Sequence, residues 1–203
     1  DWFDSILEPD ILDQVLPGLE SALKDIPLLF TFRTQKEGGH VPAPLPAYRS
    51  LVEQAICSGH VHLVDLELFS GDDMVRETVE LARRHQVRVI LSNHDFAATP
   101  KEDDILRRLH HMEELGADIA KIAVMPRSAR DVLTLLSATD KASQSLSCPV
   151  VTMSMKGTGL ISRLSGEVFG SCLTFGSVKE ASAPGQIEAG KLKDILTAIH
   201  ENL

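Results

Sequence analysis

Short apolar runs alternate along this chain with segments whose apolar residues recur every three or four positions. An apolar run of strand length predicts a buried strand, and the three-to-four spacing predicts an amphipathic helix. The strands are expected at 27–33, 61–68, 87–93, 118–125, 149–155 and 173–178. The helical sets are Ile11, Val15, Leu19 and Leu23; Met74, Thr78 and Ala82; Ile105, Leu109 and Met112; and Leu192, Ile195, Leu196 and Ile199. Because apolar strands separated by helices indicate a parallel sheet, the sequence predicts an α/β fold with six strand–helix units in one domain, residues 1–203.

Three positions carry residues typical of a helix start. Thr99 precedes Pro100, and Glu102 stands three residues after Thr99, which is the pattern of a capping box with a proline in the first turn. Ser128 and Ser70 are each followed three residues later by Asp. We therefore expect helices to begin after Thr99, Ser128 and Ser70.

Polar and sulfur-containing side chains share one face of the predicted strands, mostly near the strand ends. Side chains alternate across a strand, so residues of the same parity point the same way. The members of this face are Thr31 and Arg33, Asp65 and Glu67, Ser92 and His94, Lys121, and Met153 and Met155. The carboxyl ends of parallel strands form the mouth of a barrel or the edge of an open sheet, where such folds place their sites. The shared face therefore favours a functional site, although each residue alone also has a structural explanation.

Lys121 is the most informative of these residues, because a lysine in the middle of an apolar strand needs an explanation. Desolvation favours the neutral amine of a lysine, which can attack a ketone and form an imine. A protonated imine withdraws electrons and acidifies the neighbouring C–H bond. His94 is the candidate base that removes this proton, since histidine changes charge near neutral pH. Glu37 is a candidate to orient the imidazole.

Two arginines and one loop complete the candidate site. Arg33 and Arg163 suit a substrate carboxylate, because a guanidinium binds that group with two hydrogen bonds. Ser182 and Gln186 lie in the small-residue loop SAPGQ, after the last expected strand, where a loop can close over a ligand.

Composition excludes several other classes of protein. The chain has 203 residues and a formal net charge of −9, without a basic block, which argues against nucleic acid or an acidic membrane as its partner. No apolar run has the length of a membrane span. The three cysteines are far apart and include no CxxC pair, which favours reduced thiols in a cytoplasmic protein. The eight histidines have no metal-binding spacing, so no metal is expected.

Seven ordered stretches together resemble one family, the type I 3-dehydroquinate dehydratases, which are Schiff-base enzymes of the shikimate pathway. The stretches are LLFTFRTQKEGG (28–39), DLELFSGDD (65–73), LSNHDFAATP (91–100), GADIAKIAVMP (116–126), VTMSM (151–155), ISRLSGEVFGS (161–171) and KEASAPGQI (179–187). The resemblance implies a (β/α)8 TIM barrel, a homodimer, a small-molecule substrate and no cofactor. In the family, two further strands precede the segment similar to DWFDS, so this chain is expected to be a fragment or an N-terminally truncated barrel with six of the eight units.

The resemblance also implies roles for single residues. Lys121 forms the imine with the C3 ketone of 3-dehydroquinate, and His94 removes the C2 proton and helps to expel the C1 hydroxyl as water. Glu37 supports His94. Arg163 binds the substrate carboxylate. The remaining substrate contacts are expected from Arg33, Ser182, Gln186, Met153 and Met155.

Three other readings remain open at this point. Another lysine-imine barrel enzyme, such as a class I aldolase or a transaldolase, would keep Lys121 and change the substrate. An inactive fragment of the dehydratase would bind or dimerise without turnover. A ligand-binding barrel would use Lys121 only as an ion-pair partner of Asp65 or Glu67.

Overall fold

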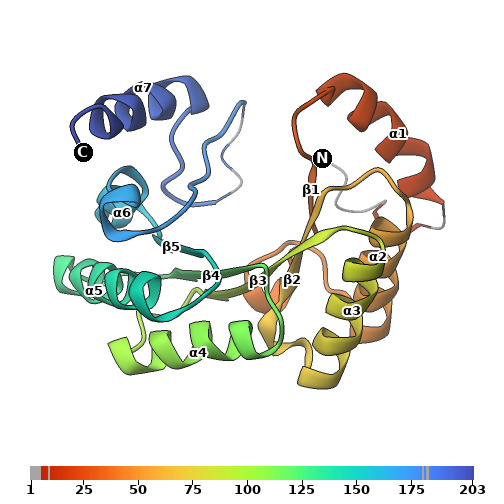
Figure 1. Cartoon of the computed structure of the whole chain (residues 1–203), viewed down its shortest axis with the longest axis horizontal. Coiled ribbons are helices and arrows are strands. Elements are labelled where there is room, and N and C mark those ends of the chain that lie inside the picture. Colours follow the sequence, from red (N-terminus) through yellow and green to blue (C-terminus); the bar gives the residue numbers. More distant parts are fainter. Residues whose placement is uncertain (1–5, 9, 180, 182) are drawn as a thin grey trace. The chain divides into compact units, whose positions relative to one another are not determined.

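The structure is a computed structural model that describes residues 6–8, 10–179, 181 and 183–203. The chain divides into two compact units. Figure 1 labels their helices and strands in chain order. The first unit extends to Asn93 and includes Leu115–Asp118, and the second contains His94–Glu114 and Ile119–Leu203. In each unit, parallel strands pack against α-helices, as the sequence predicts.

The first unit contains three strands in a parallel arrangement. β2 pairs with β1 on one side and with β3 on the other, so that Thr31 is level with Asp65, and Glu67 is level with Ser92. β3 ends in the second unit, to which its last two residues belong. The elements in chain order are α1 (Ile11–Leu23), β1 (Leu29–Thr31), the 3-10 helix η1 (Gln35–Glu37), α2 (Leu45–Cys57), β2 (Leu63–Glu67), η2 (Leu68–Ser70), α3 (Asp72–Arg84) and β3 (Arg88–Asp95).

The apolar parity of these strands forms the core, against α2 and α3. Phe32 places its ring 6.1 Å from the ring of Tyr48 on α2. The other buried strand residues of this parity are Phe30, Val64, Leu66, Val89 and Leu91. Since burial of one such side chain contributes about 1.5–3 kcal/mol, this face fixes which way the opposite, polar parity must point.

Helix α1 packs through a different face from the one predicted. Leu12 and Leu16 are buried, whereas Leu19 is 41% exposed. A strict spacing of four advances about 40° beyond a full turn at each step, so the series starting at Ile11 winds around the helix. The buried contact is made by Leu12 and Leu16, each one position after Ile11 and Val15.

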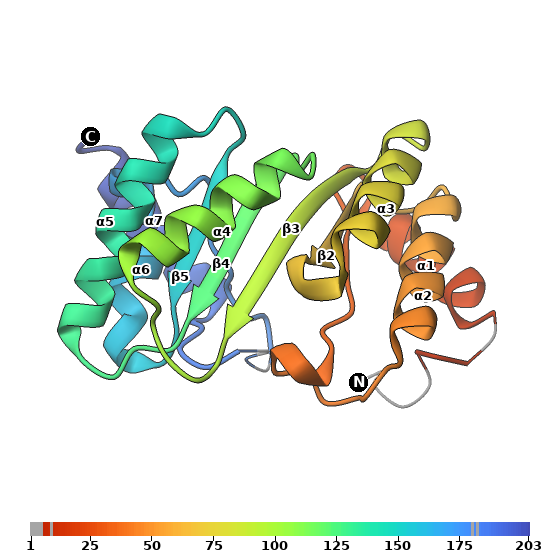
Figure 2. The same ribbon diagram turned by 90° about the horizontal axis from the view of Figure 1, so that it is seen from below.

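The second unit contains the parallel pair β4 and β5, with α4 and α5 packed side by side against the strands (Figure 2). Ala120 is level with Val150 and Val124 with Ser154. The elements are α4 (Glu102–Glu114), β4 (Ile119–Val124), α5 (Ala129–Ser145), β5 (Val150–Ser154), η3 (Gly157–Gly159), α6 (Leu160–Leu164), η4 (Glu167–Phe169) and α7 (Ala189–His200).

One of the three predicted helix starts is confirmed. Ser128 and its Asp form a capping box at the start of α5. Helix α4 begins at Glu102, where the carbonyl of Lys101 accepts from the N–H groups of Asp104 and Ile105, and the Thr99 hydroxyl instead donates to the carbonyl of Met125 at 3.1 Å. Helix α3 begins after Gly71, and Ser70 ends η2 instead.

The strand predicted at 173–178 does not form. An isolated bridge joins Ser171 to Val150, and a second joins Ser177 to Glu188. The backbone of Ser177 bonds the segment that leads into α7, through its N–H to Ile187 at 2.8 Å and through its carbonyl from Ala189 at 2.8 Å. The N–H and the carbonyl of Ser177 therefore bond the segment before α7 and not a neighbouring strand.

Candidate active site

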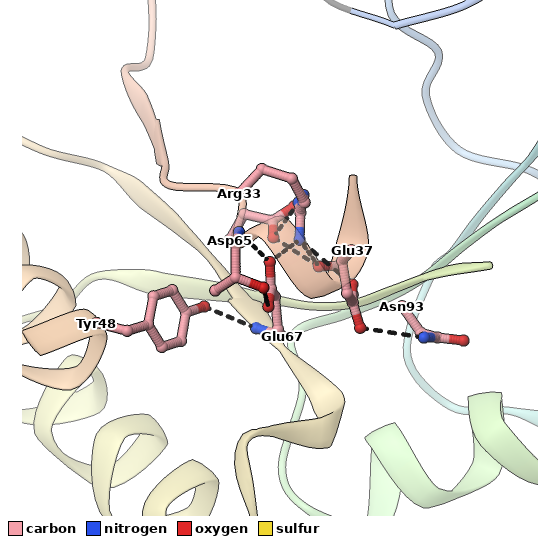
Figure 3. Close-up of polar contacts among 8 residues, drawn as sticks. Arg33, Glu37, Tyr48, Asp65, Glu67 and Asn93 are labelled. Carbon is pink, nitrogen blue, oxygen red and sulfur yellow. Dashed lines mark hydrogen bonds and ion pairs between the residues drawn. The ribbon is translucent and has the colours of Figure 1, made fainter. Parts of the chain in front are cut away.

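The first unit contains a buried cluster of charged side chains around Arg33 (Figure 3). The Arg33 Nη2 atom lies 2.6 Å from Oδ1 of Asp65, and its Nη1 atom lies 3.0 Å from Oε1 of Glu67 and 3.5 Å from Oε2 of Glu37. Nη1 also donates to Ser92 Oγ at 3.1 Å, and Ser92 donates to the same Asp65 oxygen at 2.6 Å. Three carboxylates and one hydroxyl thus hold one guanidinium.

The electrostatics of this cluster keep the guanidinium charged. Burial alone would lower the pKa of Arg33, but the charges of Asp65, Glu67 and Glu37 raise it more, so the net shift is upward. Asp65 and Glu67, the carboxylates that were considered as partners of Lys121, both bond Arg33.

Glu67 also holds the backbone that follows Arg33. The Thr34 N–H donates to Glu67 Oε1 at 2.8 Å, and the Thr34 hydroxyl donates to Oε2 at 2.6 Å. On the other side, the backbone N–H of Glu67 donates to the hydroxyl of Tyr48 at 2.9 Å. Neither Thr34 nor Tyr48 was identified from the sequence. Thr34 could have been considered, because it directly follows the candidate residue Arg33 at the end of a predicted strand.

The turn after Arg33 places Glu37. The carbonyl of Thr34 accepts from the N–H of Glu37 at 3.0 Å and from the N–H of Gly39 at 2.8 Å. A Cβ atom on Gly39 would lie 1.8 Å from the carbonyl oxygen of Arg33, so this close approach requires glycine. The Glu37 carboxylate, which is buried, accepts from the Asn93 side-chain amide at 3.1 Å.

The second unit buries Lys121 on a face rich in methionine. Lys121 is 6% exposed, and its Nζ atom lies 4.8 Å from the centre of the Phe175 ring. The residues that share its parity form one apolar cluster, which we call the methionine face: Ala123, Met125, Val151, Met153 and Met155, with Ile119, Leu173 and Phe175 packed against it. His94, which is half-buried, belongs to the same unit.

Arg163, on α6, is buried beside the methionine face. The residue is 1% exposed, and its Nη1 atom lies 3.4 Å from the sulfur of Met153. Its Nη2 atom donates to the carbonyl of Pro184 at 3.4 Å, and its Nε has no hydrogen-bond partner. Burial lowers the pKa of the guanidinium. Within the described part of the chain, no carboxylate pairs with this cation.

The loop of residues 183–187 lies against the end of β5. The N–H of Lys156 donates to the carbonyl of Pro184 at 3.1 Å, the same oxygen that Arg163 contacts. Gln186 is half-buried in this loop, and its N–H donates to the Ala183 carbonyl at 3.3 Å. Ser182 lies outside the described residues.

The site residues thus fall in both units. Arg33 and Glu37 lie in the first, and His94, Lys121, Met153, Met155, Arg163 and Gln186 lie in the second. Across the described residues, no group of three or more His, Cys, Asp or Glu side chains is arranged to hold a metal ion. No helix in the described part of the chain is long and apolar enough to cross a membrane.

Comparison with known proteins identifies the family. The sequence model of the type I 3-dehydroquinases matches residues 1–203. The chain is 50% identical over 202 residues to the 3-dehydroquinate dehydratases of Salmonella choleraesuis (strain SC-B67) and Salmonella agona (strain SL483), covering 99% of this chain and 80% of each of those proteins. The chain belongs to the type I 3-dehydroquinase family. Its reaction is the dehydration of 3-dehydroquinate, EC 4.2.1.10, a step of the shikimate pathway.

Solved structures of the type I 3-dehydroquinases agree with this assignment. The enzyme from Clostridium difficile, described with covalently modified comenic acid, has a TM-score of 0.96 and 46% identity, covering 100% of this chain and 80% of that one. The enzyme from Geobacillus kaustophilus HTA426 has a TM-score of 0.90 and 39% identity, covering 95% of this chain and 76% of that one.

Proposed function

We propose that this type I 3-dehydroquinase dehydrates its substrate through an imine on Lys121. The observation that carries the proposal is the combination of two buried basic side chains around the methionine face. Lys121 offers an amine there, and Arg163 offers a guanidinium with no carboxylate partner among the described residues. Since a buried cation without a partner is costly, a bound anion is its natural complement.

The proposed chemistry begins at Lys121. Its neutral amine attacks the C3 ketone, and loss of water gives a protonated imine. The methionine face excludes water, which protects the imine from early hydrolysis. The Phe175 ring, 4.8 Å from Nζ, stabilises positive charge through its π electrons. The covalently modified ligand of the Clostridium difficile relative supports the presence of a nucleophile in this family's site.

His94 then moves the proton in both later steps. It removes the C2 proton, and the electron pair of that C–H bond enters the imine to give an enamine. The enamine pushes out the C1 hydroxyl, which leaves as water when His94 returns the proton. Hydrolysis of the imine releases 3-dehydroshikimate and restores Lys121.

The other residues bind and orient the substrate in this proposal. Arg163 pairs with the substrate carboxylate, and Met153 and Met155 contact the ring. Glu37 supports His94, and Arg33, Ser182 and Gln186 contact the substrate. The roles of Arg33 and Glu37 are supported by the hydrogen bonds that hold the Arg33 guanidinium and the turn carrying Glu37, because residues that contact a substrate must be held in a fixed geometry.

The proposal extends to the whole enzyme. We propose that the chain forms one domain of a (β/α)8 barrel type, that the enzyme is a homodimer in the cytoplasm, and that it needs no cofactor. The resemblance supports each of these statements, and the chain spans 80% of the length of the relatives it matches.

Imine trapping tests the mechanism. The chain is incubated with 3-dehydroquinate and borohydride, and intact mass and peptide mapping locate the adduct. We expect an adduct on the peptide that holds Lys121, and none in Lys121→Ala, which should lose turnover but still bind substrate. Lys141→Ala, which changes an exposed lysine on α5 paired with Glu102, is the matched control and should retain the adduct. Substantial turnover in Lys121→Ala would refute the imine, and trapping by an aldol donor alone would identify an aldolase.

A further inference from the structure

We propose that Glu67 and Thr34 are positioning residues, which together hold Arg33 and the turn that carries Glu37 in their working geometry. The inference rests on the proposed function, because Arg33 and Glu37 are the residues it positions. Neither Glu67 nor Thr34 needs to touch the substrate for this role.

Glu67 uses both carboxylate oxygens inside the cluster. Oε1 accepts from Arg33 Nη1 at 3.0 Å and from the Thr34 N–H at 2.8 Å, and Oε2 accepts from the Thr34 hydroxyl at 2.6 Å. Glu67 is 4% exposed and Thr34 is 9% exposed, so water competes little for these bonds. Charge-assisted bonds of this length are the strong ones in proteins.

Thr34 transmits this constraint to Glu37 through its backbone. Its carbonyl accepts the N–H of Glu37 and the N–H of Gly39, so the whole turn from 34 to 39 closes on one oxygen. The near contact between Gly39 and the Arg33 carbonyl leaves this turn little freedom to shift. A displacement of Thr34 must therefore move both Arg33, its neighbour in sequence, and Glu37.

Tyr48 fixes Glu67 from the helix side. Its buried hydroxyl accepts the backbone N–H of Glu67 at 2.9 Å, which anchors the end of β2 to α2. Burial, together with the charges of Glu67 and Asp65, raises the pKa of Tyr48, so the hydroxyl stays protonated. The chain of contacts thus runs from a core helix to the two proposed site residues.

The test compares Thr34→Val, Thr34→Ser and Thr139→Val. Valine keeps the shape of threonine but loses the hydroxyl, and serine keeps the hydroxyl. Thr139 is a buried threonine of α5 whose hydroxyl bonds Leu135 and Thr152, outside the cluster. We measure kcat and KM for 3-dehydroquinate, borohydride trapping of Lys121 and the melting temperature of each variant.

The expected result separates positioning from simple stability. Thr34→Val should lower kcat/KM by about 10- to 100-fold, because a small misplacement of site groups has that effect. It should lower kcat through Glu37 and raise KM through Arg33, while trapping of Lys121 persists. Thr34→Ser should recover most of the activity. Thr139→Val should lower the melting temperature without changing either kinetic constant.

Two outcomes would overturn this inference without affecting the proposed function. One is wild-type kinetics in folded Thr34→Val, and the other is failure of Thr34→Ser to restore activity lost in Thr34→Val. If Thr34→Val does not fold, Tyr48→Phe replaces it, since that change removes only the hydroxyl that anchors Glu67, and unchanged kinetics there would likewise refute the role. Absence of both turnover and adduct in the unaltered chain would instead refute the proposed function, and the inference with it.

Discussion

Replacing Arg163 with methionine should stabilise the fold and weaken substrate binding at the same time. Arg163 is 1% exposed as a residue, the Nε of its guanidinium has no hydrogen-bond partner, and its contacts to Met153 and Pro184 are 3.4 Å long. Desolvation of an ion costs several kcal/mol even after relaxation. The two contacts of Arg163 are long, and one is to the weakly accepting sulfur of Met153, so they offset only part of this cost.

The magnitude of each effect follows from this balance. Methionine matches the apolar face beside Met153, so the free energy of unfolding should rise by about 1–3 kcal/mol. For a chain of this size, that corresponds to a rise of about 2–12 °C in melting temperature. Loss of the cation that pairs with the substrate carboxylate should cost about 2–5 kcal/mol, which lowers kcat/KM by about 30- to 5,000-fold.

Thermal unfolding and steady-state kinetics on the same preparations measure both effects. Saturating substrate at about 100 times its dissociation constant should stabilise the wild type by about 2.7 kcal/mol and the variant hardly at all. Arg107→Met, at an exposed arginine of α4 that pairs with Asp104, is the control and should change stability by about 0.5 kcal/mol or less. A marked loss of stability in Arg163→Met, or kinetics like those of the wild type, would show that Arg163 is a structural cation.

Three further changes test other features. His94→Ala should lower kcat by about 10²–10⁴-fold while the imine still forms, and unchanged turnover would rule out its role as the base. Gly39→Ala forces a Cβ to within 1.8 Å of the Arg33 carbonyl and should cost about 1–3 kcal/mol in chemical denaturation, whereas Gly18→Ala, in open space on α1, should not destabilise the chain. Lys156→Gly should stabilise the chain by about 1 kcal/mol, because Lys156 has φ of 58° and ψ of −179°, and a lower denaturation midpoint would contradict the strain.

The parity of the strand residues could be predicted from the sequence because burial enforces it. Phe30 and Phe32 must face the core, so Arg33 and the residues of its face point the other way. The same reasoning placed Lys121 with Met153 and Met155, and in the structure Lys121 is level with Val151, which lies on the methionine face with both. Period-two alternation and the hydrophobic effect were sufficient for these faces.

Contacts between distant segments were not predictable in this way. The bond from Thr34 to Glu67 spans 33 residues, and no local pattern in the sequence specifies it. The position of Thr99 depends on a similar contact, since its hydroxyl donates to the carbonyl of Met125, 26 residues further along the chain. The strand predicted at 173–178 is wrong, because Leu173 and Phe175 pack against the methionine face from an irregular segment.

Several residues between 33 and 39 share hydrogen-bond partners, which limits the substitutions that this segment can accept. Thr34 gives two donors to Glu67 and one acceptor to the turn, so substitutions at these positions are energetically coupled, by about 0.5–3 kcal/mol per pair. A double-mutant cycle here should be far from additive. Arg33, Thr34, Glu37 and Gly39 should therefore be exchanged together in a designed library, whereas Leu133, which is 65% exposed, can be changed by itself.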